Sequence, residues 1–142
     1  MVKIYLDDVR VPLDDSWIVV KNFDEFVAKI NLIGLENIEL ISLDHDLGRQ
    51  AMQEYFNSVQ HNYTLNYDNI VNEKTGYDCA KFLVRYSMDK KIPLPRIQVH
   101  SANPIGSANI TGYINNYLKN CNLPQNCNRA EVSFKVGNTT FN

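Results

Sequence analysis

Short apolar runs alternate with amphipathic stretches along most of this 142-residue chain, and the alternation limits the fold more than any other feature. The runs are rich in Val, Ile and Leu and are shorter than typical helices, as expected for buried strands. They lie at residues 2–6, 17–20, 38–43, 97–99 and 132–136. Strands separated by helical patterns predict a doubly wound α/β sheet of about five mostly parallel strands, similar to a flavodoxin-like sheet.

The stretches between the runs carry helix signals. Asn22 and Glu25 can cap a helix whose apolar residues recur at helical spacing. Thr75 and Asp78 have the spacing of a capping box, which predicts a second helix. The Asn-Pro pair at 103–104 supplies a cap and a first-turn proline for a third. These signals place helices between the predicted strands.

Two segments depart from the regular alternation. Residues 7–16 are too few for a crossover helix, so we expect the first helix to be stunted or missing. Residues 49–74 are polar and rich in Asn, Gln and Tyr. We interpret them as a variable insertion, with a partial helix and an irregular or hairpin excursion, in one domain spanning residues 1–142. The tyrosines of this insertion could form a lid, stack on a base or line an oligomer interface: Tyr55, Tyr63 and Tyr67.

Charge and composition exclude some classes of function. The chain has 14 Lys and Arg against 16 Asp and Glu, a net charge of −2, which argues against an extended nucleic-acid groove but allows a single nucleotide as ligand. No apolar run approaches the roughly 18 residues of a membrane span, and the N-terminus has no signal-peptide core. We therefore expect a cytoplasmic domain without membrane segments. Its cysteines lack metal-site spacing and are expected to be idle thiols: Cys79, Cys121 and Cys127.

Reactive side chains follow three of the predicted strands. They are Asp7 and Asp8 after the first, Asp44, His45 and Asp46 after the third, and His100 and Ser101 after the fourth. Polar residues at a strand end are often turn or cap residues. The carboxyl ends of parallel strands share one edge, however, and open α/β sheets bind ligands there. Three such clusters at one edge favour a functional site.

The residue types in this set indicate particular chemistry. Carboxylates suit a hard divalent cation such as Mg²⁺, so the metal candidates are Asp7, Asp8, Asp44 and Asp46. Without a cation, at least one such clustered carboxyl should have a raised pKa. Imidazoles suit acid–base work, so the catalytic candidates are His45, His100 and Asp44. Free amides at the start of a helix suit a phosphate, and the substrate-binding candidates are Arg10, Ser101, Asn103, Gly106 and Ser107.

Three short motifs are similar to those of a known family. They are LDDVRVP at 6–12, SLDHDLG at 42–48 and HSANP at 100–104. Together they resemble the cyclic-phosphate processing receiver-like domains, which are relatives of response-regulator receivers. The resemblance implies that Asp7 and Asp8 match the metal-binding acidic pair, and that Asp44 matches the phosphoacceptor. It also implies that Ser101 matches the hydroxyl residue after the fourth strand, with Lys135 as the candidate for the last-strand lysine.

The two histidines, His45 and His100, have no counterpart in ordinary receivers. The resemblance ties them to cleavage of cyclic phosphates, so we expect hydrolysis of a cyclic phosphate on a nucleotide or nucleotide-derived metabolite. One histidine would activate water and the other would protonate the departing oxygen in a shared pocket. Two alternatives stay open. One is a signalling module that accepts a phosphoryl group on Asp44, and the other is a protein that binds a cyclic nucleotide without cleaving it. The oligomeric state is left open by the sequence.

Overall fold

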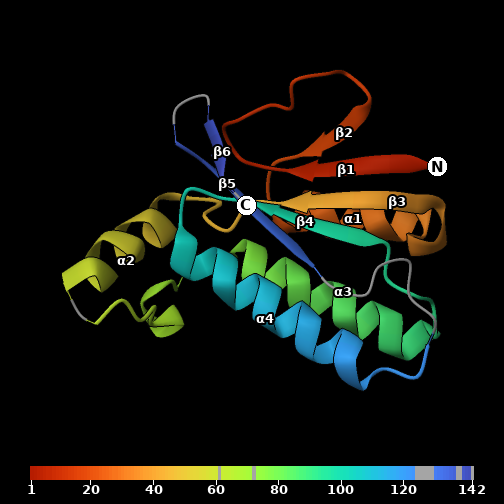
Figure 1. Ribbon diagram of the computed structural model, residues 1–142. Helices are drawn as coiled ribbons and strands as arrows, with labels where there is room; N and C mark the ends of the chain where they lie inside the picture. The colour runs from red at the N-terminus through yellow and green to blue at the C-terminus, as the bar shows by residue number, and fades with distance from the viewer. Residues whose placement is uncertain (61, 72, 124–129, 137–138, 142) are drawn as a thin grey trace.

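The computed structural model describes residues 1–60, 62–71, 73–123, 130–136 and 139–141, and for residues 132–141 it describes the backbone alone. The strands are β1 (Val2–Leu6), β2 (Trp17–Val20), β3 (Ile38–Leu43), β4 (Arg96–His100), β5 (Glu131–Val136) and β6 (Thr139–Phe141). The α-helices are α1 (Phe23–Ile33), α2 (Arg49–Gln60), α3 (Gly76–Lys90) and α4 (Pro104–Asn120). Two short 3₁₀ helices, η1 (Leu35–Asn37) and η2 (Tyr67–Asn69), complete the set (Figure 1).

The strands form one sheet in the order β2-β1-β3-β4-β5-β6. Neighbouring strands from β2 to β5 are parallel, and β6 pairs antiparallel with β5. The α/β class and the parallel sheet flanked by helices are therefore confirmed. The described residues form six strands where five were expected, because β6 follows β5 closely in the chain. So short a connection allows only antiparallel pairing with β5.

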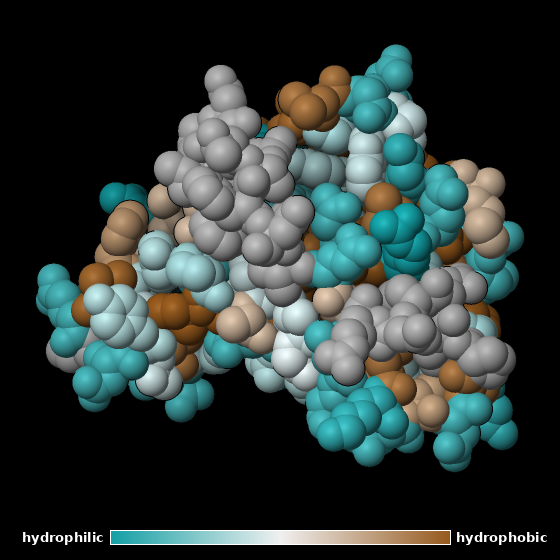
Figure 2. Space-filling view, in the orientation of Figure 1, coloured by the Kyte–Doolittle hydropathy of each residue, from teal (hydrophilic) through white to brown (hydrophobic). Residues whose placement is uncertain are grey.

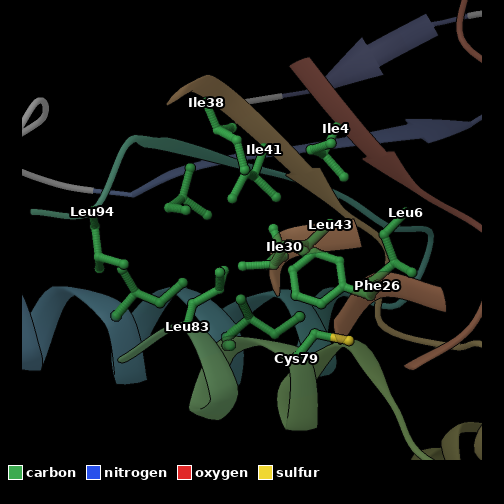
Figure 3. Close-up of a cluster of buried hydrophobic side chains, with 14 of the residues drawn as sticks. Ile4, Leu6, Phe26, Ile30, Ile38, Ile41, Leu43, Cys79, Leu83 and Leu94 are labelled. Atoms are coloured by element: carbon green, nitrogen blue, oxygen red, sulfur yellow. The ribbon is translucent and has the colours of Figure 1, made fainter. Parts of the chain in front are cut away.

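Helices α1, α3 and α4 pack in one layer on one face of the sheet, and a single core lies between the two layers (Figures 1 and 3). Core residues alternate with residues of the other face along each central strand, because successive side chains of a strand point to opposite faces. Its strand residues include Ile4, Leu6, Ile41, Leu43, Ile97 and Val99. The doubly wound arrangement is therefore incomplete: among the described helices, none packs on the opposite face. One cause is the connection at 7–16, which contains no helix, as expected.

The predicted caps set where the helices begin. The Asn22 side chain accepts a hydrogen bond from the Glu25 amide at 2.9 Å at the start of α1. Thr75 and Asp78 form the reciprocal capping box of α3. Asn103 caps α4 and is followed by Pro104 at the first helical position. Each cap satisfies backbone donors that a helix start leaves unpaired.

Residues 49–74 contain α2 and η2, held together by a buried acid. Glu54 accepts hydrogen bonds from the Asn66 amide and the Asn69 side chain, both at 2.9 Å. One face of α2 stays exposed and apolar, with Met52 and Phe56 at 50% and 61% exposure. Figure 2 shows hydrophobic residues among hydrophilic ones where α2 lies. No described helix is both long and apolar enough to cross a membrane.

Candidate active site at the carboxyl edge of the sheet

Three carboxylates meet where β1 and β3 end. These strands are parallel neighbours in register at Leu6 and Leu43, so the residues that follow them lie side by side. Asp7, Asp8 and Asp44 each offer an oxygen, and the three oxygens lie within 4.8 Å of one another. Asp7 and Asp44 are buried and Asp8 is half-buried. The predicted acidic cluster thus exists, with three of its four expected members.

Arg10 bridges two of these acids. Its Nε lies 2.8 Å from Asp7 Oδ2 and its Nη2 lies 3.0 Å from Asp44 Oδ1. Asp7 Oδ1 also accepts hydrogen bonds from the Val9 and Arg10 amides at 2.9 and 2.8 Å. The turn after β1 is therefore built around Asp7. Arg10, expected as a substrate-binding residue, is already paired with carboxylates, although its side chain keeps 37% exposure.

The pKa values of the three acids differ with their surroundings. Burial opposes ionisation of Asp7, but hydrogen bonds from His100 and from the Val9 and Arg10 amides outweigh it and lower its pKa. Burial first, and then the charge of Asp7, raise the pKa of Asp44 to about 8 despite Arg10. The same two causes raise the pKa of Asp8. This agrees with the expectation for clustered carboxylates without a cation.

The donor set fits a hard divalent cation, because such ions take carboxylate oxygens. Asp7 uses both oxygens within the protein. Asp44 uses Oδ1 to accept from Arg10 and from the His45 amide. Among the described residues, none donates a hydrogen bond to Asp44 Oδ2. This oxygen and the Asp8 carboxylate are therefore the groups that can turn to an ion as ligands. The cluster can therefore hold a metal ion at Asp44 and Asp8, with Asp7 beside them.

His100 lies against this cluster on the face of the sheet away from the helices. Its Nε2 is 3.0 Å from Asp7 Oδ2, and its Nδ1 is 2.6 Å from the hydroxyl of Ser42. The ring stacks on Tyr5 with centroids 4.2 Å apart. Because an ionised carboxylate only accepts hydrogen bonds, Nε2–H donates to Asp7, and Nδ1 shares a hydrogen bond with the Ser42 hydroxyl. His100 is thus held at the acids by Asp7 and Ser42.

His45 lies on the opposite side, under the first turn of α4. Its ring is fully buried, and a Cβ on Gly106 would overlap it. Its Nδ1 is 2.6 Å from Asp46 Oδ1, and its Nε2 is 2.8 Å from the hydroxyl of Tyr67. The Asn109 side chain donates to that hydroxyl at 3.1 Å, which leaves the Tyr67 hydrogen for His45 Nε2. Burial raises the pKa of Tyr67 to about 12, so the phenol stays protonated.

The expectation that both imidazoles line one pocket is wrong, because strand parity separates them. His100 alternates with Ile97 and Val99, which face the helices, so its side chain lies on the other face. His45 has the parity of Ile41 and Leu43 and turns toward α4. The sequence contained this signal, since the apolar positions of each strand already define its core face.

Several other candidates have structural partners in place of a ligand. Asp46 is outside the cluster of three and accepts from His45 and, at 3.1 Å, from the Asn103 side chain. Ser101 Oγ accepts from the Asn103 amide at 3.1 Å. The Gly106 amide donates to Asn103 Oδ1 and the Ser107 amide to the Asn103 carbonyl, both at 2.9 Å. The predicted phosphate site at these amides is therefore occupied by the cap of α4.

The remaining candidates and the residues that were not expected complete the site. The Ser107 hydroxyl is buried without a partner among the described residues. The Lys135 side chain and Cys127 lie outside the described residues, while Cys79 is a buried thiol without a disulfide. Ser42 and Tyr5 were not predicted. A serine between two apolar residues near the end of β3 was the available signal for Ser42.

The fold and this edge define a receiver-like α/β domain with an acidic cluster after β1 and β3 and with imidazoles beside it. The sequence profile of the family described as the cyclic-phosphate processing receiver domain matches residues 2–116. The chain belongs to this family. Searches among curated proteins and among solved structures gave no significant match.

Proposed function

We propose that this protein hydrolyses a cyclic phosphate on a nucleotide or nucleotide-derived metabolite. The observation that carries the proposal is the contact between His100 and the acidic cluster, with Arg10 beside it. Phosphoryl chemistry uses three kinds of group that meet here: an imidazole, a guanidinium, and acids that can hold a cation. Membership of the family supports the same class of substrate.

The acids Asp8 and Asp44 are proposed to hold a divalent cation, Mg²⁺ in our proposal, beside Asp7. When bound, it would neutralise charge on the phosphoryl group. Arg10 would turn part of its guanidinium from the carboxylates to the phosphoryl oxygens, a geometry that suits a planar fork of donors.

His100 is the proposed acid–base residue, acting through Nε2. Water attacks phosphorus and forms a new P–O bond, and the bond from phosphorus to one ribose oxygen breaks. The Nε2–H gives its proton to the released oxygen, and Nε2 then takes up the proton that the attacking water loses, which leaves a phosphomonoester and a hydroxyl group. His100 must first exchange its bond to Asp7 for one to the reactants, while Ser42 holds Nδ1.

His45 takes a different role from the one first expected. Both of its nitrogens are bonded and its ring is fully buried, so we assign it as a positioning residue. Its amide donates to Asp44 Oδ1 at 2.9 Å, and its ring fixes the turn after β3. In this way it sets the orientation of Asp44.

A second candidate is binding of a cyclic nucleotide without cleavage. The observation that favours it is that His100, like His45, has both nitrogens engaged within the protein. If neither imidazole is released by a ligand, the site recognises the phosphate but transfers no proton.

Phosphorus NMR of a panel of cyclic mono- and oligonucleotides, with and without Mg²⁺, tests both candidates. Hydrolysis converts the cyclic phosphate resonance into a monoester resonance, and the conversion should require both Mg²⁺ and His100. Line broadening without conversion would support binding alone. A long-lived phosphoaspartate on Asp44 after treatment with a small phosphodonor would contradict both and favour a signalling receiver.

A further inference from the structure

A cavity lies between the segment after η2 and the first turns of α3, next to the turn that follows β3. Its volume is about 400 Å³, within the usual range for small-molecule sites. It is lined chiefly by Tyr67, Ile70, Val71, Lys74, Tyr77 and Lys81. In Figure 1 this region is the yellow-green chain between α2 and α3.

Aromatic rings form one wall of this cavity. Tyr67 and Tyr77 stack with centroids 5.0 Å apart, and both are half-buried. The Tyr67 ring lines the cavity while its hydroxyl contacts His45. Because the two rings cover each other's facing sides, a planar ligand would pack against the outer side or the edges of the pair, next to apolar Ile70 and Val71.

Two lysines line the cavity. Lys81 Nζ lies 4.8 Å from the centre of the Tyr77 ring, and Lys74 Nζ lies 5.3 Å from that of Phe23. Among the described residues, neither lysine forms an ion pair. The acids of the same wall are committed elsewhere, because Asp78 caps α3 and Glu73 accepts from the Ala51 amide at 2.6 Å. The lining thus contains two acids that backbone and capping hydrogen bonds hold in place, and two lysines whose ammonium groups can turn to an anionic ligand.

We infer that this cavity binds the nucleoside part and a non-cyclic phosphate of a nucleotide. Stacking on Tyr67 and Tyr77 would hold the base, and Lys74 and Lys81 would hold the phosphate. The inference rests on the proposed function for the idea that the ligand is a nucleotide. It adds a specificity site at the cavity, because Tyr67 connects the cavity to His45.

Isothermal titration calorimetry with adenosine 5′-monophosphate, adenosine and inorganic phosphate tests this inference. The nucleotide should bind saturably, and adenosine and phosphate should each bind at least about tenfold more weakly, because each keeps one half of the contacts. The double variant Lys74→Gln/Lys81→Gln should weaken nucleotide binding by about tenfold or more. Val71→Glu places a negative charge on an exposed cavity residue and should weaken it similarly.

Lys90→Gln is the matched control, because Lys90 Nζ lies 4.6 Å from the Tyr86 ring on the same helix but outside the cavity. It should keep the affinity of the parent. No saturable binding, or an equal loss in Lys90→Gln, would overturn the inference. Binding that persists when no cyclic phosphate is cleaved would overturn only the proposed hydrolysis.

Discussion

At the scale of single residues, the neighbours of each titratable side chain determine what it can do. Asp7 and Asp44 are adjacent carboxyls, yet the pKa of one is lowered and that of the other is raised to about 8. The difference comes from donors, because Asp7 accepts from His100, from Arg10 and from two amides. His100 and His45 also differ in their neighbours, since only the His100 ring contacts the acidic cluster.

Replacement of His100 tests its assigned role. His100→Gln should lower kcat/KM for a cyclic phosphate by about 10²-fold or more, with a smaller change in KM, because an acid–base residue acts mainly on the transition state. Tyr5→Phe is the control, since it keeps the ring that stacks on His100. A folded His100→Gln protein with the activity of the parent would exclude this mechanism.

Asp44 should make stability depend on pH when no divalent cation is present. Its folded pKa, about 8, is above the ordinary value of 3.8, so the folded state holds a proton that the unfolded state releases between these values. The free energy of unfolding should therefore fall as pH rises from 4 toward 8, by at most about 1.4 kcal/mol per pH unit from this group.

Urea unfolding of the parent and of Asp44→Asn at pH 5.5 and pH 8 measures this effect. The variant should lose most of the decrease and should be more stable than the parent at pH 8. Asp7 has the opposite sign, but its lowered pKa confines its effect to pH values below about 4. The same pH dependence in parent and variant would show that Asp44 is ionised throughout.

At the scale of secondary-structure elements, caps and close contacts position the site. The start of α4 is held by Asn103, whose side chain also bonds Asp46, the partner of His45. Gly106 lets this turn approach the His45 ring. The helix starts and most strand bounds were predictable, because capping residues and apolar periodicity act over a few residues. The role of Gly106 was not predictable, since its neighbour, His45, lies in the turn after β3, far away in the chain.

Gly106→Ala should destabilise the protein by about 1–3 kcal/mol, because the new methyl group overlaps the His45 ring. Gly112→Ala, on the same helix with no neighbour within 4 Å, should stabilise it by about 0.5–1 kcal/mol. Thermal unfolding of the two variants compares them directly. An equal effect of both substitutions would mean that α4 does not pack closely against the His45 ring.

At the scale of the whole molecule, one helical layer supports the sheet and the other face carries part of the site. Tyr5, Ser42 and His100 share that face, where a short connection at 7–16 replaces a helix. These three side chains are buried, although no described helix packs on this face. The short connection is a departure from ordinary receivers, whose usual signalling surface is built from helices.

A divalent cation should stabilise the whole fold by mass action. Mg²⁺ at about 100 times its Kd should add about 2.7 kcal/mol to the free energy of unfolding and raise Tm by several degrees. Asp8→Asn should remove most of this gain, while Asp89→Asn, an exposed acid on α3, should not. Calorimetry with EDTA or 10 mM Mg²⁺ checks it, and an unchanged Tm in the parent would argue against a metal site.

The sequence by itself determined the alternation of strands and helices, the helix caps and the gathering of Asp7, Asp8 and Asp44, because these follow from local periodicity and from the shared edge of parallel strands. Tertiary structure decided which groups meet. Arg10 occupies the acids, Tyr67 bonds His45, and the amides near Gly106 serve a cap in place of a phosphate. Such pairings join residues far apart in the chain, and their geometry depends on how the layers pack.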